Sequence, residues 1–249
     1  MVGDRVLVVP DGEQKGTVAD ILPRKNYFLR PAVANLDLLV ILASCSIPVT
    51  DPFLIDRMTA IAIRQGVRPV ICVNKTDLCA PEPLADIYRL AGFPVVCTSA
   101  ETGTGIDALR ALICGRTAAF TGNSGVGKSA ILSRLCPNRE IETGAVSQKL
   151  GRGRHTTRHV ELYPLGDETY VADTPGFSSL DLPDMTENEL AGCFPEFAPF
   201  TGECAFRDCR HEKEKICGIR RAVQEGLISQ SRYDSYLRFL SELRGRRPY

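Results

Sequence analysis

The sequence predicts an α/β fold built around a mostly parallel sheet. Short apolar runs that suit buried strands alternate with segments of helical periodicity, which is the pattern of βαβ units. Polar or glycine-rich motifs directly follow several of these runs, and parallel sheets bind ligands at the carboxyl ends of their strands. A group of cysteines with one histidine toward the C-terminus indicates a further, metal-stabilised unit.

The chain divides into three parts. Residues 1–31 show strand-like alternation around Gly12 and Gly16, residues 32–182 carry the alternating strands and helices, and residues 183–249 hold the cysteine group and further helical segments. We therefore expect a segment of short strands, then the sheet domain, then a small α-helical domain.

The sheet domain opens with an apolar run at Leu38–Ala43, which predicts a buried strand. A helix should follow, because Asp51 is suited to its N-cap, Pro52 to its first position and Gly66 to the residue beyond its end near Gln65.

The next two predicted strands each end in a polar motif. The strand Pro94–Cys97, the second of the two in the chain, is followed by Ser99 and Ala100. The first, Pro69–Val73, leads into the motif Asn74, Lys75, Thr76 and Asp77. In this motif the Asp77 carboxylate would accept hydrogen bonds from guanine, and adenine lacks the matching donors, so Asp77 would select guanine. Ala100 would place a backbone N–H near the guanine oxygen. A polar turn after a strand is the alternative interpretation of either motif alone.

A phosphate loop follows between a predicted strand at Thr117–Thr121 and a helix that runs from Lys128 to Cys136 and stops at Pro137. Its glycines would let backbone N–H groups surround the phosphates, with Lys128 at the β- and γ-phosphates and Ser129 on Mg²⁺. The nucleotide-binding residues expected here are Thr121, Gly122, Asn123, Ser124, Gly125, Val126, Gly127, Lys128 and Ser129. This loop alone fits ATP as well as GTP.

Another motif, Asp-Thr-Pro-Gly at Asp173–Gly176, follows the predicted strand Glu168–Ala172. Asp173 would contact Mg²⁺, and the Gly176 N–H would contact the γ-phosphate. Phe177 stands where Ras-like enzymes carry the glutamine that orients the attacking water, so hydrolysis requires another group or a partner. A proline turn after a strand is the alternative interpretation.

The basic stretch 149–158 contains candidates for catalysis. His155 is the nearest candidate to position the water, and a surface or RNA contact is its alternative role. Thr156 or Thr157 would coordinate Mg²⁺ when the γ-phosphate is present, and we favour Thr157. The expected catalytic residues are His155, Lys128 and Thr157, and the expected Mg²⁺ ligands are Ser129, Thr157 and Asp173.

The order of these motifs is rotated. An ordinary GTPase carries the phosphate loop and the Asp-x-x-Gly motif before the Asn-Lys-x-Asp and Ser-Ala motifs, whereas here the last two come first. Four motifs in cyclic rotation indicate a circularly permuted P-loop GTPase. The rival classes are a P-loop ATPase or nucleotide kinase, against which Asn74 and Asp77 argue, and an RNA-binding scaffold with little turnover, for which Phe177 argues.

A zinc site is predicted at Cys204, Cys209, His211 and Cys217, which provide three thiolates and one imidazole within fourteen residues. Such a closed set suits tetrahedral structural Zn²⁺, with disulfides inside the group as the alternative. The seven other cysteines lie mostly in apolar runs and are expected to be small buried hydrophobes rather than a disulfide framework.

The C-terminal part should also contain two helices. Thr186 and Glu189 form a capping box for a short helix before the zinc loop. The apolar face of a terminal helix consists of Tyr233, Tyr236, Leu237 and Leu240.

Composition agrees with a soluble, cytoplasmic enzyme. The 249 residues include 30 basic and 30 acidic side chains, so no global charge attracts nucleic acid. Local basic excesses at residues 149–158 and 220–249 suit phosphate-backbone contacts, and a solvated helix face explains the second equally well. The longest apolar run is too short to span a bilayer.

Taken together, the chain resembles the ribosome small-subunit-dependent GTPase family, RsgA/YjeQ. The motifs that carry the resemblance are Pro23–Asn26, Arg30–Pro31, Ala34–Asp37, Asn74–Asp77, Thr121–Ser129, Lys149–Thr157, Asp173–Phe177 and the cysteine–histidine group. The resemblance implies an N-terminal OB-fold, a permuted G domain, and a zinc-binding helical domain. It also implies GTP hydrolysis stimulated by the small ribosomal subunit during late maturation, with binding to ribosomal RNA, and we expect a monomer without membrane attachment.

Two expectations follow from this resemblance. Only the last part of an OB-fold is present in residues 1–31, because so few residues cannot close a five-stranded barrel. The segment after Gly176 leads directly into the zinc-binding part, so we hypothesise that the GTP state sets the orientation of that part for ribosome docking and release.

Overall fold

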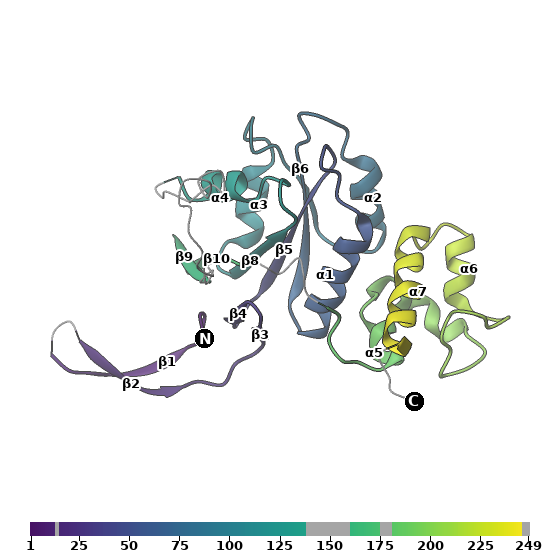
Figure 1. Ribbon diagram of the computed structural model, residues 1–249, viewed down its shortest axis with the longest axis horizontal. Coiled ribbons are helices and arrows are strands. Elements are labelled where there is room, and N and C mark those ends of the chain that lie inside the picture. The colour runs from purple at the N-terminus through teal and green to yellow at the C-terminus, as the bar shows by residue number, and fades with distance from the viewer. Residues whose placement is uncertain (13–14, 138–159, 175–180, 246–249) are drawn as a thin grey trace, which may run out of the picture.

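The computed structural model describes residues 1–12, 15–137, 160–174 and 181–245. Its centre is a six-stranded sheet in the order β7 (Val95–Cys97), β6 (Arg68–Asn74), β5 (Leu38–Ser44), β8 (Thr117–Gly122), β10 (Thr169–Asp173) and β9 (Glu161–Gly166) (Figure 1). Neighbouring strands are parallel except for β9, which runs antiparallel to β10. The predicted α/β class is confirmed.

The two faces of the sheet support separate cores because side chains of a strand alternate between faces. On β5, Leu39 and Ile41 belong to one core, whereas Leu38 and Val40 belong to the other. The first core packs against α1 (Pro52–Arg64) and α2 (Glu82–Leu90), and the second packs against α3 (Ile106–Ile113) and α4 (Lys128–Leu135). Every residue of β5 is buried, as expected of a central strand covered on both sides.

The helix signals of the sequence predict α1 and α4 correctly. The Asp51 side chain accepts a hydrogen bond of 2.9 Å from the backbone N–H of Phe53, Pro52 occupies the first position, and Gly66 has a left-handed φ of 68° beyond the end. Helix α4 runs from Lys128 to Leu135, one residue short of the predicted end.

The N-terminal residues form two separate hairpins. Among the described strands, β1 (Val6–Pro10) and β2 (Gly16–Ile21) pair only with each other, and they project from the molecule (Figure 1). Strands β3 (Tyr27–Leu29) and β4 (Ala32–Ala34) form the second hairpin, whose buried Phe28 and Val33 belong to the core under α1. The expected division after residue 31 therefore lies between β3 and β4.

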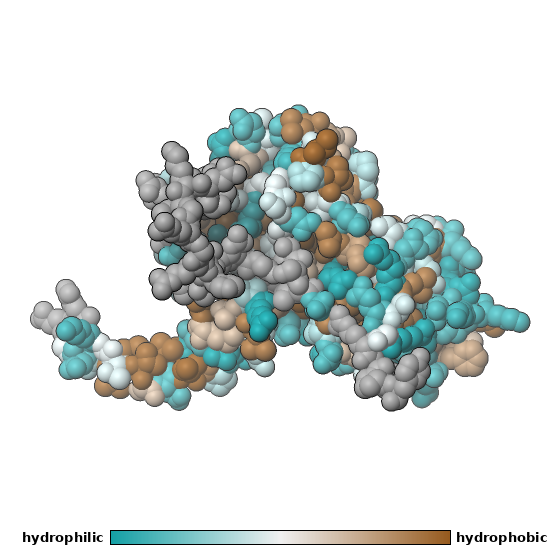
Figure 2. Space-filling model, in the orientation of Figure 1, coloured by the Kyte–Doolittle hydropathy of each residue, from teal (hydrophilic) through white to brown (hydrophobic). Residues whose placement is uncertain are grey.

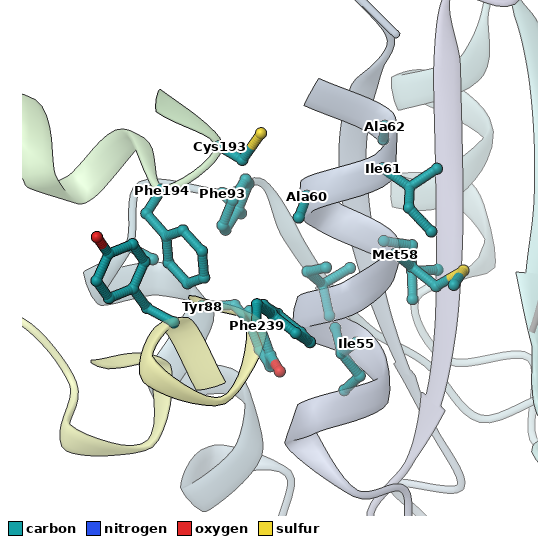
Figure 3. Packing of buried hydrophobic residues seen from close by; sticks show 14 of the residues in the cluster. Ile55, Met58, Ala60, Ile61, Ala62, Tyr88, Phe93, Cys193, Phe194 and Phe239 are labelled. Atoms are coloured by element: carbon teal, nitrogen blue, oxygen red, sulfur yellow. The ribbon is translucent and has the colours of Figure 1, made fainter. Parts of the chain in front are cut away.

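The C-terminal residues form a helical unit packed against α1. It contains α5 (Glu187–Gly192), the 3₁₀ helix η2 (Pro195–Glu203), α6 (Gly218–Gln224) and α7 (Gln230–Gly245). The capping box is present, since Thr186 and Glu189 bond to each other's backbone N–H. Phe194 and Phe239 of this unit meet Tyr88 and Phe93 of the central domain in one continuous core (Figure 3).

The buried face of α7 differs in part from its prediction. Tyr233, Tyr236 and Leu240 are buried as expected, but Leu237 is only partly buried. Phe239 and Arg232, which were not predicted, are completely buried on the same face. Because Arg232 is paired with Asp56 and Glu196, a charged residue takes a core position that apolar periodicity does not detect.

Candidate nucleotide and metal sites

The predicted nucleotide motifs meet at one edge of the sheet. Asn74 ends β6, Ser99 follows β7, Gly122 ends β8 and Asp173 ends β10. These four strands are parallel, so their carboxyl ends lie together, and such an edge is where open α/β sheets bind ligands.

The glycines of the phosphate loop are required by close contacts. Gly125 and Gly127 have φ values of 82° and 94°, in the region that favours glycine. A Cβ at Gly127 would lie 2.3 Å from Asn74 Nδ2, so a larger residue would expel that amide. The loop is therefore shaped around Asn74, a residue of a different motif.

Asn74 links three parts of the site. Its Nδ2 donates a hydrogen bond of 2.9 Å to the carbonyl of Val126 in the phosphate loop. Its Oδ1 accepts from Thr98 Oγ1 at 3.2 Å and from the backbone N–H of Ala100 at 3.1 Å. The expected base-binding and phosphate-binding motifs thus form a single constellation.

Thr98 was not predicted from the sequence. Its side chain is buried, and its backbone also receives hydrogen bonds from Thr76, through the N–H at 3.2 Å and through Oγ1 at 3.1 Å. A threonine directly before the Ser-Ala motif was the available signal, since a buried hydroxyl at a strand end needs a polar partner.

Lys75 and Asp77 lie at the mouth of this site. Lys75 has a positive φ of 69°, and its Nζ donates a hydrogen bond of 2.8 Å to the carbonyl of Ile47 in the loop after β5. Asp77 is exposed at the tip of the motif, where its carboxylate is accessible to a base.

Lys128 and Asp173 lie face to face at the phosphate end of the site. Their side chains form an ion pair between α4 and the end of β10. The next residue, Thr174, is anchored by a hydrogen bond of 3.0 Å from its Oγ1 to the carbonyl of Phe120. Ser129 follows Lys128 in the first turn of α4, so a residue with a hydroxyl group adjoins this pair of an ammonium group and a carboxylate.

Several predicted residues lie outside the described part of the chain. These are His155, Thr156, Thr157, Gly176 and Phe177. Their assignments stay predictions.

The expected zinc ligands form a compact group. The ligand atoms of Cys204, Cys209, His211 and Cys217 all lie within 4.8 Å of one another. His211 Nδ1 lies 3.6 Å from Cys204 Sγ and 3.4 Å from Cys217 Sγ, and the two sulfurs are 3.9 Å apart. A tetrahedral Zn²⁺ with ordinary bond lengths requires edges of about 3.8 Å between sulfurs and about 3.5 Å from sulfur to nitrogen. The distances among Cys204, His211 and Cys217 match these edges, and the Cys209 sulfur lies within 4.8 Å of the other ligand atoms, so the four residues suit a zinc ion.

The protonation of this group also suits metal binding. Burial raises the pKa of Cys209 to about 12 and also raises the pKa of Cys217, while it lowers the pKa of His211. Buried thiols and a neutral imidazole avoid charge in a low dielectric, and a divalent cation would supply the charge that stabilises thiolates.

One cysteine pair departs from the expectation of separate, buried thiols. Cys45 after β5 and Cys79 after the Asn-Lys-x-Asp motif form a disulfide, with their Cα atoms 6.2 Å apart. The two residues are 34 positions apart, and spacing alone does not predict that the carboxyl ends of β5 and β6 bring them together.

Among the helices of the described residues, none combines the length and the apolar character needed to cross a bilayer.

Comparisons with known proteins agree with this geometry. The chain matches the sequence model of the RsgA GTPase over residues 21–183. It is 42% identical to the small ribosomal subunit biogenesis GTPase RsgA of Alkaliphilus metalliredigens over 254 residues, which covers 100% of this chain and 87% of that protein. It is 45% identical over 243 residues to the protein of the same name from Moorella thermoacetica, covering 97% and 84% of the two chains.

Two solved structures have the same fold. The crystal structure of YjeQ from Thermotoga maritima superposes with a TM-score of 0.84 at 35% identity and covers 99% of this chain and 85% of its own. The structure of YloQ, a circularly permuted GTPase, gives a TM-score of 0.81 at 32% identity, with coverage of 100% and 82%. The predicted permuted GTPase fold is confirmed.

Proposed function

The chain belongs to the RsgA GTPase family, and from this premise we propose that it hydrolyses GTP to GDP and phosphate as a biogenesis factor of the small ribosomal subunit. The hydrogen bond from Asn74 Nδ2 to the carbonyl of Val126 carries this proposal, because it joins motifs 52 residues apart into one site. The base motif and the phosphate loop are therefore positioned for a single nucleotide.

Selection of guanine is assigned to Asp77 and Ala100. The exposed Asp77 carboxylate would accept from the ring N–H and amino group of guanine, and the Ala100 N–H, which donates to Asn74 Oδ1 in this structure, would donate to the carbonyl oxygen of guanine when the base is bound. Asn74, Lys75, Thr76 and Ser99 shape this pocket, and residues 121–129 with Gly176 surround the phosphates.

Hydrolysis is assigned to the groups at the phosphate end. Ser129 and Asp173, with Thr157, provide the hydroxyl and carboxylate oxygens that Mg²⁺ prefers. The Lys128 ammonium neutralises phosphate charge, and its pairing with Asp173 keeps both groups in the site. His155 is assigned to position the attacking water. When bound, Mg²⁺ supplies charge stabilisation at the phosphates.

The proposed partner is the small ribosomal subunit with its ribosomal RNA, contacted during late maturation by a monomer in the cytoplasm. The zinc-binding helical unit would provide part of the docking surface. Only residues 175–180 lie between Thr174, at the nucleotide site, and Asp181, which leads to α5. A connection this short supports coupling between the switch region and the zinc unit.

The direct test is GTP turnover with and without purified small subunits. We expect slow turnover alone, a large increase with subunits, and competition by GDP but not by ADP. Tight GTP binding without turnover in either condition would favour the RNA-binding scaffold instead. Competition by ADP as strong as that by GDP would contradict the guanine assignment.

The Asp77→Asn substitution tests the base site. It should weaken GDP binding by about 2–4 kcal/mol, because an amide cannot accept both hydrogen bonds from guanine. The same amide can donate to the second carbonyl of xanthine, so binding of xanthosine diphosphate should improve, as titration calorimetry would measure. Asp86→Asn, which changes an exposed carboxylate on α2, is the control and should alter neither affinity.

A further inference from the structure

Three loops build the nucleotide site, and two of the links between them run through Asn74. One link joins the Asn-Lys-x-Asp motif to the phosphate loop at Val126, and the other joins it to Ala100 of the Ser-Ala loop. A third link, directly between the phosphate-loop helix and the Ser-Ala loop, is formed by an arginine that no motif predicts.

Arg134 forms this third link. It lies in the last turn of α4, the helix that begins at Lys128 of the phosphate loop. Its Nε donates to the carbonyl of Ala100 at 2.8 Å, and its Nη2 donates to the carbonyl of Glu101 at 2.5 Å. Two neighbouring carbonyls are thus held by one planar guanidinium, whose fork geometry suits two acceptors at once.

The loop needs an external tether at these two carbonyls. Hydrogen bonds within the loop form a turn at Ser99. The Thr102 N–H donates to Ser99 Oγ at 3.1 Å, and the Gly103 N–H donates to the Ser99 carbonyl at 2.9 Å. These bonds fix the shape of the turn, and Asn74 Oδ1 accepts from the Ala100 N–H, but none of these contacts attaches the carbonyls of Ala100 and Glu101 to the rest of the domain. Arg134 does so from a helix whose start is the phosphate loop.

We propose that Arg134 is a positioning residue for guanine recognition, which holds the Ala100 N–H at the distance from the phosphate loop that a bound guanosine nucleotide requires. This inference rests on the proposed function. Arg134 touches neither base nor phosphate in this assignment, and it acts through the two carbonyls it binds. Losing it lets the Ser-Ala loop tilt, so the hydrogen bond to the guanine oxygen weakens while the phosphate contacts persist.

The neighbouring helix offers a matched control. Arg110 belongs to α3, the helix beside α4 in Figure 1. It donates to the carbonyls of Leu135 and Arg134, both at 3.3 Å, and so holds the far end of α4. It makes the same kind of arginine-to-carbonyl contact in the same region but has no hydrogen bond to the Ser-Ala loop among those of the described residues. Arg110→Ala therefore removes equivalent support of α4 without releasing the loop.

The experiment compares Arg134→Ala, Arg134→Lys and Arg110→Ala with the unmodified chain. Affinities for GDP and for 6-thioguanosine diphosphate are measured by titration calorimetry. The thio analogue keeps the N–H groups that donate to Asp77 but replaces the carbonyl oxygen of guanine by sulfur, a weaker acceptor. Arg134→Ala should weaken GDP binding about three- to ten-fold, the range expected for one hydrogen bond, and should weaken binding of the thio analogue less than about two-fold. Arg134→Lys should fall between Arg134→Ala and the unmodified chain.

Turnover separates this role from a general loss of structure. With small subunits present, Arg134→Ala should raise KM for GTP and leave kcat within about two-fold, and Arg110→Ala should change neither beyond about two-fold. Equal losses for GDP and the thio analogue, or a kcat that falls as far as the affinity, would refute the inference. Failure of the unmodified chain to bind GDP would instead refute the proposed function as a whole.

Discussion

The C-terminal helical unit and the N-terminal β1–β2 hairpin both flank the central sheet, but only the helical unit shares a core with it. Phe194 and Phe239 are 1% and 0% exposed and pack beside α1 (Figure 3). On the hairpin, Leu7 and Val8 are 52% and 53% exposed, and its apolar side chains extend along a thin projecting arm (Figure 2). Similar residue types thus contribute very differently to stability, because only one of the two regions has a second layer to pack against.

A buried ionic group fixes the helical unit on α1. Arg232 donates from Nε to Glu196 Oε1 at 2.7 Å and from Nη1 to Asp56 Oδ1 at 2.8 Å, and Tyr88 Oη donates to the same Asp56 oxygen at 3.0 Å. Burial by itself lowers the pKa of Arg232, and the charges of Asp56 and Glu196 more than offset it, so the arginine stays charged. Asp56 belongs to α1 and Glu196 to the helical unit, so the arginine bridges the two.

This arrangement sharpens the hypothesis that the GTP state orients the zinc-binding part. Rotating the whole unit away from α1 would expose Arg232 and break its pair with Asp56. Separating a buried ion pair costs several kcal/mol, which would use most of the free energy that a nucleotide switch provides. We therefore expect the GTP state to act on the chain between Thr174 and α5 while the contact of α7 with α1 persists.

The largest expected effect comes from loss of the metal. Structural zinc contributes on the order of 10 kcal/mol of apparent binding energy, and the loop that carries its ligands, residues 204–217, has no helix or strand of its own. Cys209→Ser should therefore unfold residues 204–217 locally and reduce helicity measured by circular dichroism. The disturbance should reach α7, because Tyr233 and Tyr236 donate to the carbonyls of His211 and Arg210 at 2.6 and 2.8 Å.

The control for this substitution is Cys114→Ser, which changes an exposed thiol far from the cluster. Elemental analysis should give about one zinc per chain for the unmodified protein and the control, and none for Cys209→Ser. GDP binding should survive in all three, since the nucleotide site has its own sheet. A metal-free chain with full helicity would refute the zinc assignment.

The next effect is that of Arg232→Ala. It should lower the free energy of unfolding by about 3–5 kcal/mol, because it leaves two buried carboxylates without their partner. Arg221→Ala is the matched control: this arginine of α6 pairs with Glu203 on the surface and is 56% exposed, so its loss should cost less than about 1 kcal/mol. Urea unfolding of both variants would measure the difference. An equal loss of unfolding free energy in Arg232→Ala and Arg221→Ala would show that the buried charges do not fix the contact of the helical unit with α1.

The fold was predictable wherever a local pattern has a single structural meaning. The apolar run of β5 and the cap at Asp51 each relate residues close in sequence, and each motif in the rotated order is itself a short local pattern. Each prediction of the fold made from them is confirmed. Three contacts were not predicted because their residues are far apart in the sequence. Arg134 and Glu101 are 33 positions apart, Arg232 and Asp56 are 176 apart, and the bridged Cys45 and Cys79 are 34 apart. A buried arginine and an exposed one have the same sequence signature, and only tertiary packing separates them.

The smallest effect is expected on the hairpin, and two valines test it as a matched pair. Val8 of β1 is 53% exposed, whereas Val33 of β4 is completely buried under α1. Val33→Ala should cost about 2 kcal/mol, since it removes buried methyl groups and leaves a void. Val8→Ala should change the free energy of unfolding by less than about 0.5 kcal/mol, because the side chain is already in water. Both are measured by urea unfolding monitored by tyrosine fluorescence, as the chain has no tryptophan. A cost at Val8 equal to that at Val33 would mean that the hairpin is packed in solution, and the contrast between the two flanking regions would then be lost.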